Sequence, residues 1–280
     1  KTGQIMAEIL HGVGFDFYLG RPLYLAPTLD EARGTTRCLG GNPSFVAESG
    51  KILMEALKTG GVFCAPSGFP GGGLNRMDRG AAVLTTPKTI LAENDLLPFA
   101  EAVQAGAAMV HVDATLAPTL DPSGGPACLS AAVMDDLLRK NMEFKGIILA
   151  GPVDAVEMGD KLDAAVSALT ALQHGADMVL WQGSISQVQR AIERIAVAVE
   201  RGEWAQAALQ ECIRRVLTAK DAWGKARATV EKPVKAKELA EWATRVERRA
   251  ITLAFHQAGA LPLLRENAVP VGITGTTGID

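Results

Sequence analysis

The feature that most constrains this chain is a regular alternation of two kinds of segment. Short apolar runs of strand length precede longer segments whose apolar residues recur every three or four positions, and Gly or Asn follows each longer segment. The expected strands are residues 15–19 or 23–26, then 62–65, 109–112, 147–150 and 178–181. The expected helices are residues 43–58, 95–105, 130–141, 161–174 and 185–201. This pattern predicts an α/β fold in which crossover helices cover a parallel sheet.

The alternation ends near Gly202, because two expected helices, residues 204–220 and 236–255, follow without a strand between them. The segment ATVEKPVKAKE, which separates these helices, is rich in Lys and Glu and is interpreted as an exposed linker. We therefore expect an α/β barrel-type domain over residues 1–224. Residues 225–280 are expected to hold the linker, a helix and the start of a further domain.

Composition restricts the classes of partner. Of the 280 residues, 48% are hydrophobic and 21% are charged, and the net charge is -3, so the basic surface that nucleic acid requires is not expected. No apolar run reaches the roughly 18 residues of a membrane span, and the first residues lack the layout of a signal peptide. The four cysteines form no C-x-x-C motif. Reduced thiols and a cytoplasmic location are therefore expected, with neither nucleic acid nor a membrane as partner.

The segment CAPSGFPGGGLNRMDRG, residues 64–80, contains three consecutive glycines directly after a short apolar run. This arrangement predicts a loop at the carboxyl end of a strand, where parallel α/β folds usually place their sites. The segment lacks the Gly-Lys-Ser/Thr of a phosphate-binding loop and the G-x-G-x-x-G of a dinucleotide site. No cofactor is expected.

Histidine and serine give little support for a metal site or a nucleophile. His111 lies inside an expected strand, where it is either a hydrogen-bonded core residue or a functional group that points into a barrel. No second His or Cys stands at ligand spacing, so no metal is expected. A G-x-S-x-G motif is absent, and Ser67, Ser130 and Ser184 are interpreted as turn or N-cap residues.

Three carboxylates follow expected strands: Asp30, Asp113 and Asp154. A pair of carboxylates about 5 Å apart suits a retaining glycosidase, and a wider pair suits an inverting one. The alternative is that each Asp forms a turn or caps the next helix. The sequence does not give the separations, so both interpretations stay open.

Several segments, read in order, resemble the N-terminal barrel domain of glycoside hydrolase family 3, and most closely its β-N-acetylglucosaminidase branch. They include IMAEILHGVGFDF, LYLAPTLD, TTRCLGGNPSFVAESG, LLPFAEAVQAGAAMV, ALQHGADMVLW and IRRVLTAK. The resemblance spans nearly the whole chain and implies a (β/α)8-like TIM-type barrel that cleaves β-linked sugars with retention. The family's D-x-E-G-G segment lies upstream of residue 1 or is absent, so a barrel that is incomplete at the N-terminus of this sequence and one that lacks the segment both stay open.

The resemblance also implies that the family's reagents are missing. The nucleophilic Asp falls at Gly151, and the acid/base His falls at Gly80. The Lys and His of K-H-F-P-G-H-G, which hold sugar hydroxyls, fall at Ser67 and Gly68, and a further family His falls at Ala114 beside Asp113. The catalytic motifs are therefore degenerate.

Three hypotheses follow. The first is a family-3 barrel with an eroded active site, which is non-catalytic and at most binds a small β-linked or N-acetylglucosamine-type sugar through Arg37, Asp30 and Ser67. In the second, a divergent glycoside hydrolase uses Asp154 as nucleophile with Asp78 or Asp113 as acid. The third, a structural or partner-binding domain, would be favoured if the side chains of Phe69, Arg76 or Met77 filled the barrel mouth.

Overall fold

The structure is a computed structural model that describes residues 1–20, 23–25, 39–71, 76–78, 81–154, 163–227, 240–245 and 248. The chain divides into two compact units, residues 1–233 and 234–280, and every element named below belongs to the first unit. The expected domain boundary at residue 224 stays a prediction, and it falls inside helix α8 (Gln206–Arg227).

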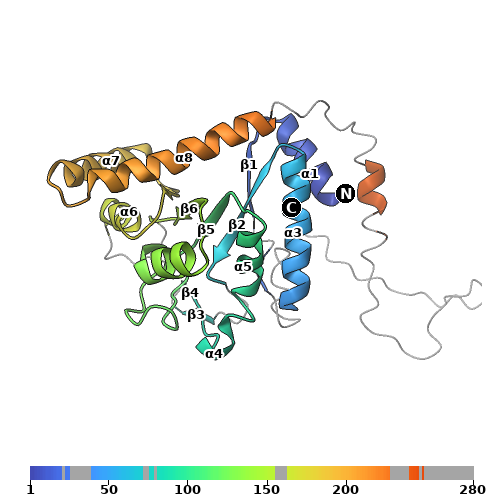
Figure 1. Ribbon diagram of the computed structural model, residues 1–280, viewed down its shortest axis with the longest axis horizontal. Coiled ribbons are helices and arrows are strands. Elements are labelled where there is room, and N and C mark those ends of the chain that lie inside the picture. Colours follow the sequence, from blue (N-terminus) through green and yellow to red (C-terminus); the bar gives the residue numbers. More distant parts are fainter. Residues whose placement is uncertain are drawn as a thin grey trace, which may run out of the picture. The chain divides into compact units, whose positions relative to one another are not determined.

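Five parallel strands form the central sheet in the order β1, β2, β5, β6, β7 (Figure 1). They are β1 (Phe17–Gly20), β2 (Phe63–Phe69), β5 (Met109–Val112), β6 (Ile147–Ala150) and β7 (Met178–Val179). The crossovers contain α3 (Pro43–Thr59), α5 (Leu97–Gln104), the π-helical segment η2 (Ala132–Asn141) and α6 (Ala164–Gln173). The predicted α/β fold, with helices connecting parallel strands, is confirmed.

The remaining elements of the described part surround this sheet. They are α1 (Thr2–Gly12), the hairpin of β3 (Arg76–Asp78) and β4 (Ala81–Val83), α4 (Lys88–Leu91), the 3₁₀ turn η1 (Ala127–Leu129) and α7 (Ile185–Glu200). Of the helix expected at 236–255, only residues 240–245 and 248 are described. Within the described ranges, we find no helix whose length and apolar character would suit a membrane span.

Strand β2 corrects one expectation about the glycine-rich segment. The sequence predicted a strand over 62–65 followed by a loop, but the strand continues to Phe69. Its register against β5 shifts between Ser67 and Phe69, and the residue between them, Gly68, has a φ of +96°. A glycine at positive φ allows a bulge, after which the pairing of the strands resumes. Ser67 is therefore a strand residue, and its interpretation as a turn or N-cap serine is wrong.

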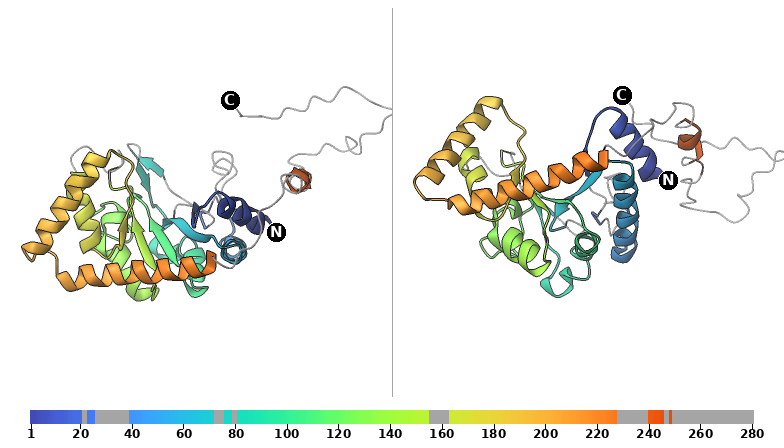
Figure 2. Two further views of the ribbon diagram at one scale, coloured as in Figure 1. Left: turned by 90° about the horizontal axis from the view of Figure 1, so that it is seen from above. Right: turned by 45° about the horizontal axis from the view of Figure 1, so that its top comes forward.

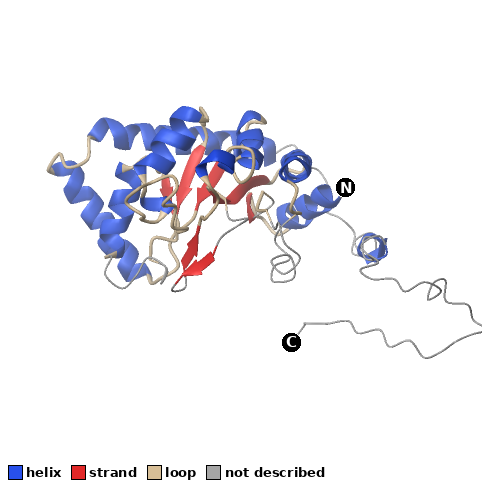
Figure 3. Cartoon of the chain, turned by 90° about the horizontal axis from the view of Figure 1, so that it is seen from below, coloured by secondary structure: helices blue, strands red, loops and turns tan. Residues whose placement is uncertain are grey.

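The crossover helices cover one face of the sheet. Alternate strand residues, including Cys64, Val110 and Ile148, share a buried apolar cluster with side chains from the helices. The main helical members of this cluster are Leu57 of α3, Phe99 of α5, Leu138 of η2 and Ala171 of α6. Figure 3 separates these helices, in blue, from the strands, in red. The hydrophobic positions that predicted the helices are thus their sheet-facing positions.

Helix α8 covers the opposite face, near the amino ends of the strands (Figure 2). The first residues of three strands, Phe63, Met109 and Ile147, form a second buried cluster with Trp223 of α8, and Val216 of α8 packs against it. Because strand side chains alternate between faces, this cluster is separate from the one beneath the crossover helices. The sheet is therefore covered on both faces at this end.

A buried carboxylate joins α8 to the sheet. The Asp177 side chain, just before β7, is fully buried. It accepts hydrogen bonds from the guanidinium groups of Arg139 in η2, at 2.7 Å, and Arg215 in α8, at 2.5 Å. It also accepts the backbone N–H of Ile148 in β6, at 2.9 Å. Both carboxylate oxygens and both cations are thus paired, as burial of charge requires.

Candidate functional site

The candidate site lies at the carboxyl ends of β2, β5 and β6, on the face of the sheet that α8 covers at the opposite end. Side chains of a strand alternate between its two faces. Counting every second residue from Phe63 reaches Ser67, and counting every second residue from Met109 reaches His111. Both side chains therefore lie on the face that packs on α8. The carboxyl ends of parallel strands are the usual position of a site in α/β folds.

A chain of hydrogen bonds crosses these strands. Ser67 Oγ lies 2.7 Å from His111 Nδ1, and His111 Nε2 lies 2.7 Å from the carbonyl oxygen of Gly151. A carbonyl oxygen can only accept, so Nε2 carries a proton; when the ring is neutral, Nδ1 accepts the Ser67 hydroxyl proton. His111 and Ser67 are only 4% and 5% exposed. His111 is therefore a hydrogen-bonded residue of the sheet, and it connects Ser67 and Gly151, the two positions at which the resemblance places family reagents.

Asp113 follows β5 directly, and its backbone N–H bonds to the carbonyl oxygen of Phe69 in β2. Its side chain is buried, and Oδ1 accepts the backbone N–H of Thr115 at 3.0 Å, which is the local turn that an Asp after a strand can form. Its other oxygen, Oδ2, lies 3.8 Å from the place that a Cβ atom of Gly68 would take. A carboxylate thus borders Gly68, the position at which the resemblance places a sugar-binding His.

Asp154 is engaged with the neighbouring loop. Its carboxylate accepts the backbone N–H of Gln182 at 3.0 Å and that of Gly183. These donors follow β7, so the carboxylate joins the loop after β6 to the loop after β7. This contact is between distant segments, and it differs from the expected turn or cap of the chain's own next helix. Asp163, which was not singled out, caps α6 instead through the N–H groups of Ala165 and Val166.

Two glycines of the segment 64–80 are required by close contacts. A Cβ atom on Gly68 would lie 3.0 Å from Tyr24 Cδ2, and a Cβ atom on Gly71 would overlap with Asp95 Cβ. Both residues have positive φ, +96° and +128°, which L side chains rarely adopt. Asp95 is itself buried and accepts the Thr86 hydroxyl at 2.6 Å. The glycines therefore serve a strand bulge and a tightly packed end of the strand.

Gly68→Ala is expected to lower the free energy of unfolding by about 2–3 kcal/mol, because a non-glycine residue in this backbone region is strained and its Cβ atom also meets the Tyr24 ring. Gly106→Ala is the matched control: Gly106 also has positive φ, +80°, but nothing lies within 4 Å of its Cβ position. Urea unfolding of both variants measures the difference. An equal loss in the two variants would contradict the contact with Tyr24.

The other predicted site residues fall partly or wholly outside the description. Asp78 lies in β3, and its side chain, like those of Arg76 and Met77, is not described; Asp30, Arg37 and Gly80 lie outside the described residues. Phe69 packs edge-on against Phe99 of α5, at 5.2 Å between ring centroids. It therefore points to the helix-covered face and does not fill the mouth.

Two further possibilities are not supported. No group of three or more His, Cys, Asp or Glu side chains in the described ranges is arranged to hold a metal ion. Cys64 and Cys128 are buried thiols, and burial raises the pKa of each to about 12, so they are poor nucleophiles near neutral pH.

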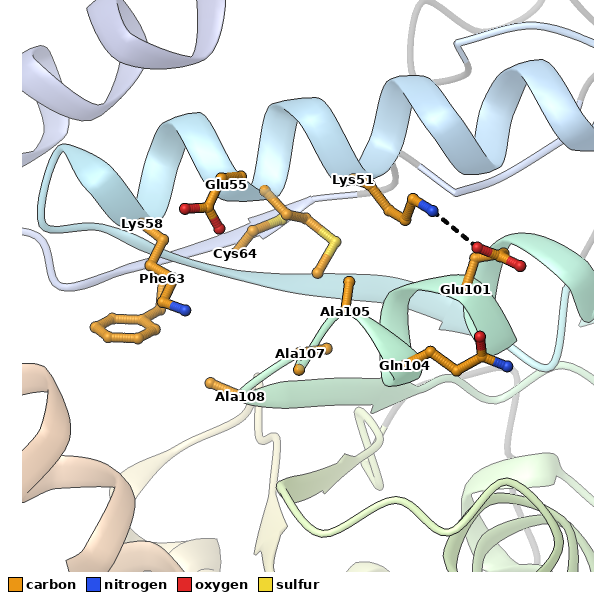
Figure 4. A pocket seen from close by; sticks show the side chains of 12 residues that line it. Lys51, Glu55, Lys58, Phe63, Cys64, Glu101, Gln104, Ala105, Ala107 and Ala108 are labelled. Carbon is orange, nitrogen blue, oxygen red and sulfur yellow. Dashed lines mark hydrogen bonds and ion pairs between the residues drawn. The ribbon is translucent and has the colours of Figure 1, made fainter.

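A cavity of about 310 Å³ lies between α3 and α5, away from the candidate site (Figure 4). Phe63 and Ala108, next to the amino ends of β2 and β5, line it, and an ion pair of Lys51 with Glu101 at 2.8 Å joins the two helices. This cavity is therefore at the opposite end of the sheet from Ser67 and Asp113.

Sequence reasoning missed the pairing of Ser67 with His111. The two residues are 44 positions apart, and no local motif connects them. Strand alternation would place each on one face of its strand, but only the register of β2 against β5, in which Ser67 pairs with His111, brings the two side chains together.

Comparison with known proteins supports the family resemblance. A curated β-hexosaminidase of Thioalkalivibrio sulfidiphilus is 30% identical over 244 residues, which cover 82% of this chain and 67% of that enzyme. The solved family 3 β-N-acetylglucosaminidase of a Paenibacillus species has a TM-score of 0.73 at 22% identity, covering 84% of this chain and 44% of that one. The β-glucoside phosphorylase BglX has a TM-score of 0.78 at 20% identity, covering 93% of this chain and 50% of that one.

The chain thus spans between 44% and 67% of the lengths of these three proteins. The two structural likenesses show a shared α/β, TIM-barrel-like fold. The family model described as "Glycosyl hydrolase family 3 N terminal domain" matches residues 1–219, most of the chain. With the 30% identical relative, this match shows that the chain belongs to glycoside hydrolase family 3, and within it to the β-hexosaminidase-like branch.

Proposed function

We propose that this chain is a family 3 barrel domain that binds a β-linked sugar of the N-acetylglucosamine type and does not perform the family's two-step hydrolysis. Covalent glycoside hydrolysis needs a carboxylate nucleophile and an acid/base group on opposite sides of the scissile bond. The resemblance places the family positions of these two groups at Gly151 and Gly80, neither of which carries a side chain. Losing the nucleophile of a covalent mechanism removes several powers of ten in rate.

The observation that carries this proposal is that the two polar groups directly after β6, the Gly151 carbonyl and the Asp154 carboxylate, already accept hydrogen bonds. The carbonyl oxygen of Gly151 accepts the His111 ring N–H. Asp154, the nearest carboxylate along the chain, accepts backbone N–H groups of Gln182 and Gly183. A carboxylate whose oxygens already accept hydrogen bonds is a weaker nucleophile, and leaving those donors would break the contact between two loops.

Support for sugar binding comes from the relatives and from the polar groups that remain. The relatives are β-hexosaminidases and a β-N-acetylglucosaminidase. Asp113 and Ser67 offer a carboxylate and a hydroxyl at the carboxyl end of the sheet, where such groups could bind sugar hydroxyls. Arg37 and Asp30 complete the set of sugar-binding residues that we propose.

The test combines turnover with binding. We expect no release of nitrophenol from p-nitrophenyl N-acetyl-β-glucosaminide above the uncatalysed rate, and we expect saturation-transfer NMR to detect binding of N-acetylglucosamine. Asp113→Asn should weaken that binding, whereas Asp163→Asn, which changes an exposed cap of α6, should not. Absence of sugar binding would contradict the proposal.

The second candidate is a divergent hydrolase, which is favoured by the position of the Asp113 carboxylate at the strand end. It requires Asp154 as nucleophile with Asp113 or Asp78 as acid, and the pair within about 5–6 Å. Turnover of the same glycoside that falls at least about 1,000-fold in Asp154→Asn, but not in Asp163→Asn, would establish this candidate and overturn the first.

A further inference from the structure

The chain of Ser67, His111 and Gly151 has the composition of an activated nucleophile. An efficient nucleophile of this kind needs a base within about 2.6–3.2 Å and a third group that orients the base. Ser67 Oγ and His111 Nδ1 are 2.7 Å apart, and the Gly151 carbonyl holds the other ring nitrogen at 2.7 Å. The hydroxyl proton therefore already lies on the hydrogen bond to the base.

We propose that Ser67 is the nucleophile of an acyl-ester hydrolysis, with His111 as its general base and the Gly151 carbonyl as the group that orients the ring. The ester joins an acyl group to an alcohol, and we assign that alcohol as a sugar hydroxyl. This assignment rests on the function proposed above. In this arrangement the catalytic residues are Ser67 and His111, and Gly151 is a positioning residue that acts through its backbone.

The reaction balances with water as the only co-reactant. Ser67 Oγ bonds to the ester carbonyl carbon while His111 Nδ1 takes the hydroxyl proton. The tetrahedral intermediate collapses, the bond to the alcohol oxygen breaks, and the alcohol leaves with that proton. Water then attacks the acyl-serine, Nδ1 takes and returns a proton, and the carboxylic acid leaves with Ser67 restored. The Nε2–H to carbonyl bond persists, and it becomes stronger when the ring is an imidazolium.

The surroundings indicate a small, uncharged ester. Ser67 and His111 are almost fully buried, and this burial favours a small acyl group over a large one. Asp113, whose Oδ2 borders Gly68, places a carboxylate beside the residue that follows the nucleophile and disfavours an anionic acyl group or alcohol. An acetyl ester of a neutral, hydroxyl-rich alcohol fits both conditions.

The position of Ser67 adds a second reason. It stands where the family pattern has a Lys, and a lysine side chain cannot form a hydroxyl–imidazole pair. This chain has therefore lost a sugar-holding cation and at the same place has a hydroxyl bonded to a histidine on the next strand.

The experiment uses the full chain and diisopropyl fluorophosphate, which bonds to an activated serine with loss of fluoride. We expect one adduct per chain, mapped to Ser67 by peptide mass spectrometry, and hydrolysis of p-nitrophenyl acetate. The rate of adduct formation and the rate of ester hydrolysis should each fall at least about 100-fold in His111→Gln. Both reactions should disappear in Ser67→Ala. Ser184→Ala is the matched control, because Ser184 is exposed and belongs to the cap of α7.

The outcomes distinguish this proposal from a structural hydrogen bond. Circular dichroism and thermal unfolding identify variants that remain folded. A folded wild type without an adduct at Ser67, or a folded His111→Gln that reacts at the wild-type rate, would overturn the proposal. If His111→Gln does not fold, His111→Asn replaces it in the same rate measurement. The presence or absence of the adduct at Ser67 of the wild type, mapped by peptide mass spectrometry, tests the proposal without any variant.

A second arm separates this site from the proposed sugar binding. Protection of Ser67 from the fluorophosphate by O-acetylated N-acetylglucosamine would support the sugar ester as substrate. An adduct that p-nitrophenyl acetate suppresses but the acetylated sugar does not would overturn that substrate class. Sugar binding measured by NMR on the wild-type chain, without the fluorophosphate, tests the function proposed above independently of the adduct.

Discussion

Asp177→Asn is expected to lower the free energy of unfolding by about 3–5 kcal/mol, which is the cost of removing one partner from a buried ion pair. The carboxylate is fully buried and serves two guanidinium groups and the N–H of Ile148. An amide would keep the shape but leave Arg139 without its carboxylate partner and Arg215 with only Glu211, at 2.9 Å. Burial lowers the pKa of Arg139, and the Asp177 charge opposes this effect. Without that carboxylate, the desolvation of the Arg139 guanidinium is uncompensated.

Urea unfolding followed by circular dichroism measures this loss. Asp136→Asn is the control. Asp136 pairs with Lys140 at 2.8 Å on the exposed surface of η2, the helix that also carries Arg139, and an exposed ion pair contributes little to stability. Its midpoint should stay close to that of the wild type. If the two variants unfolded at the same denaturant concentration, the role given to Asp177 would be wrong.

Trp223→Ala is expected to cost about 3–5 kcal/mol, the usual range for truncating a buried aromatic residue. Trp223 is buried, its ring centroid lies 3.8 Å from that of Phe17 in an edge-on contact, and 6.1 Å from that of Phe63. Truncation would expose the first residues of the strands, which α8 covers. We therefore expect binding of a hydrophobic dye as well as an earlier unfolding midpoint.

Trp223→Phe is the matched variant. The indole N–H of Trp223 is buried and has no hydrogen-bond partner among the described residues. A phenyl ring keeps most of the packing and removes this unpaired donor, so we expect a change of less than about 1 kcal/mol in either direction. A large loss in Trp223→Phe would indicate that the indole N–H is paired in solution.

The strands predicted best are those buried on both faces. The predicted ranges 109–112 and 147–150 coincide with β5 and β6, because a strand covered by helices on both sides is a continuous apolar run. The helix over 43–58 was also placed well, since Asn42 caps its start by accepting the Phe45 N–H and Gly60 follows its end. Local signals of this kind are contained in neighbouring residues.

The ends of other elements depended on distant contacts. Strand β2 continues to Phe69 because Gly68 forms a bulge against β5, and helix α8 continues to Arg227, beyond the expected end at 220, while Trp223 packs on the sheet. Neither the partner strand nor the face of a sheet can be identified from the local residues alone. The type of these two elements was therefore predicted correctly, but the residues at which they end were not.

The sequence by itself determined the strand–helix alternation and the membership of family 3. That the family's nucleophile and acid/base positions fall at Gly151 and Gly80 stays a prediction from the resemblance. These properties depend on residue type and order along the chain. Only the tertiary structure decided that Ser67 bonds to His111 and His111 to Gly151. It also decided that Asp154 is engaged by the loop after β7. The physical reason is that hydrogen bonds between strands depend on register, which the packing of both sheet faces sets.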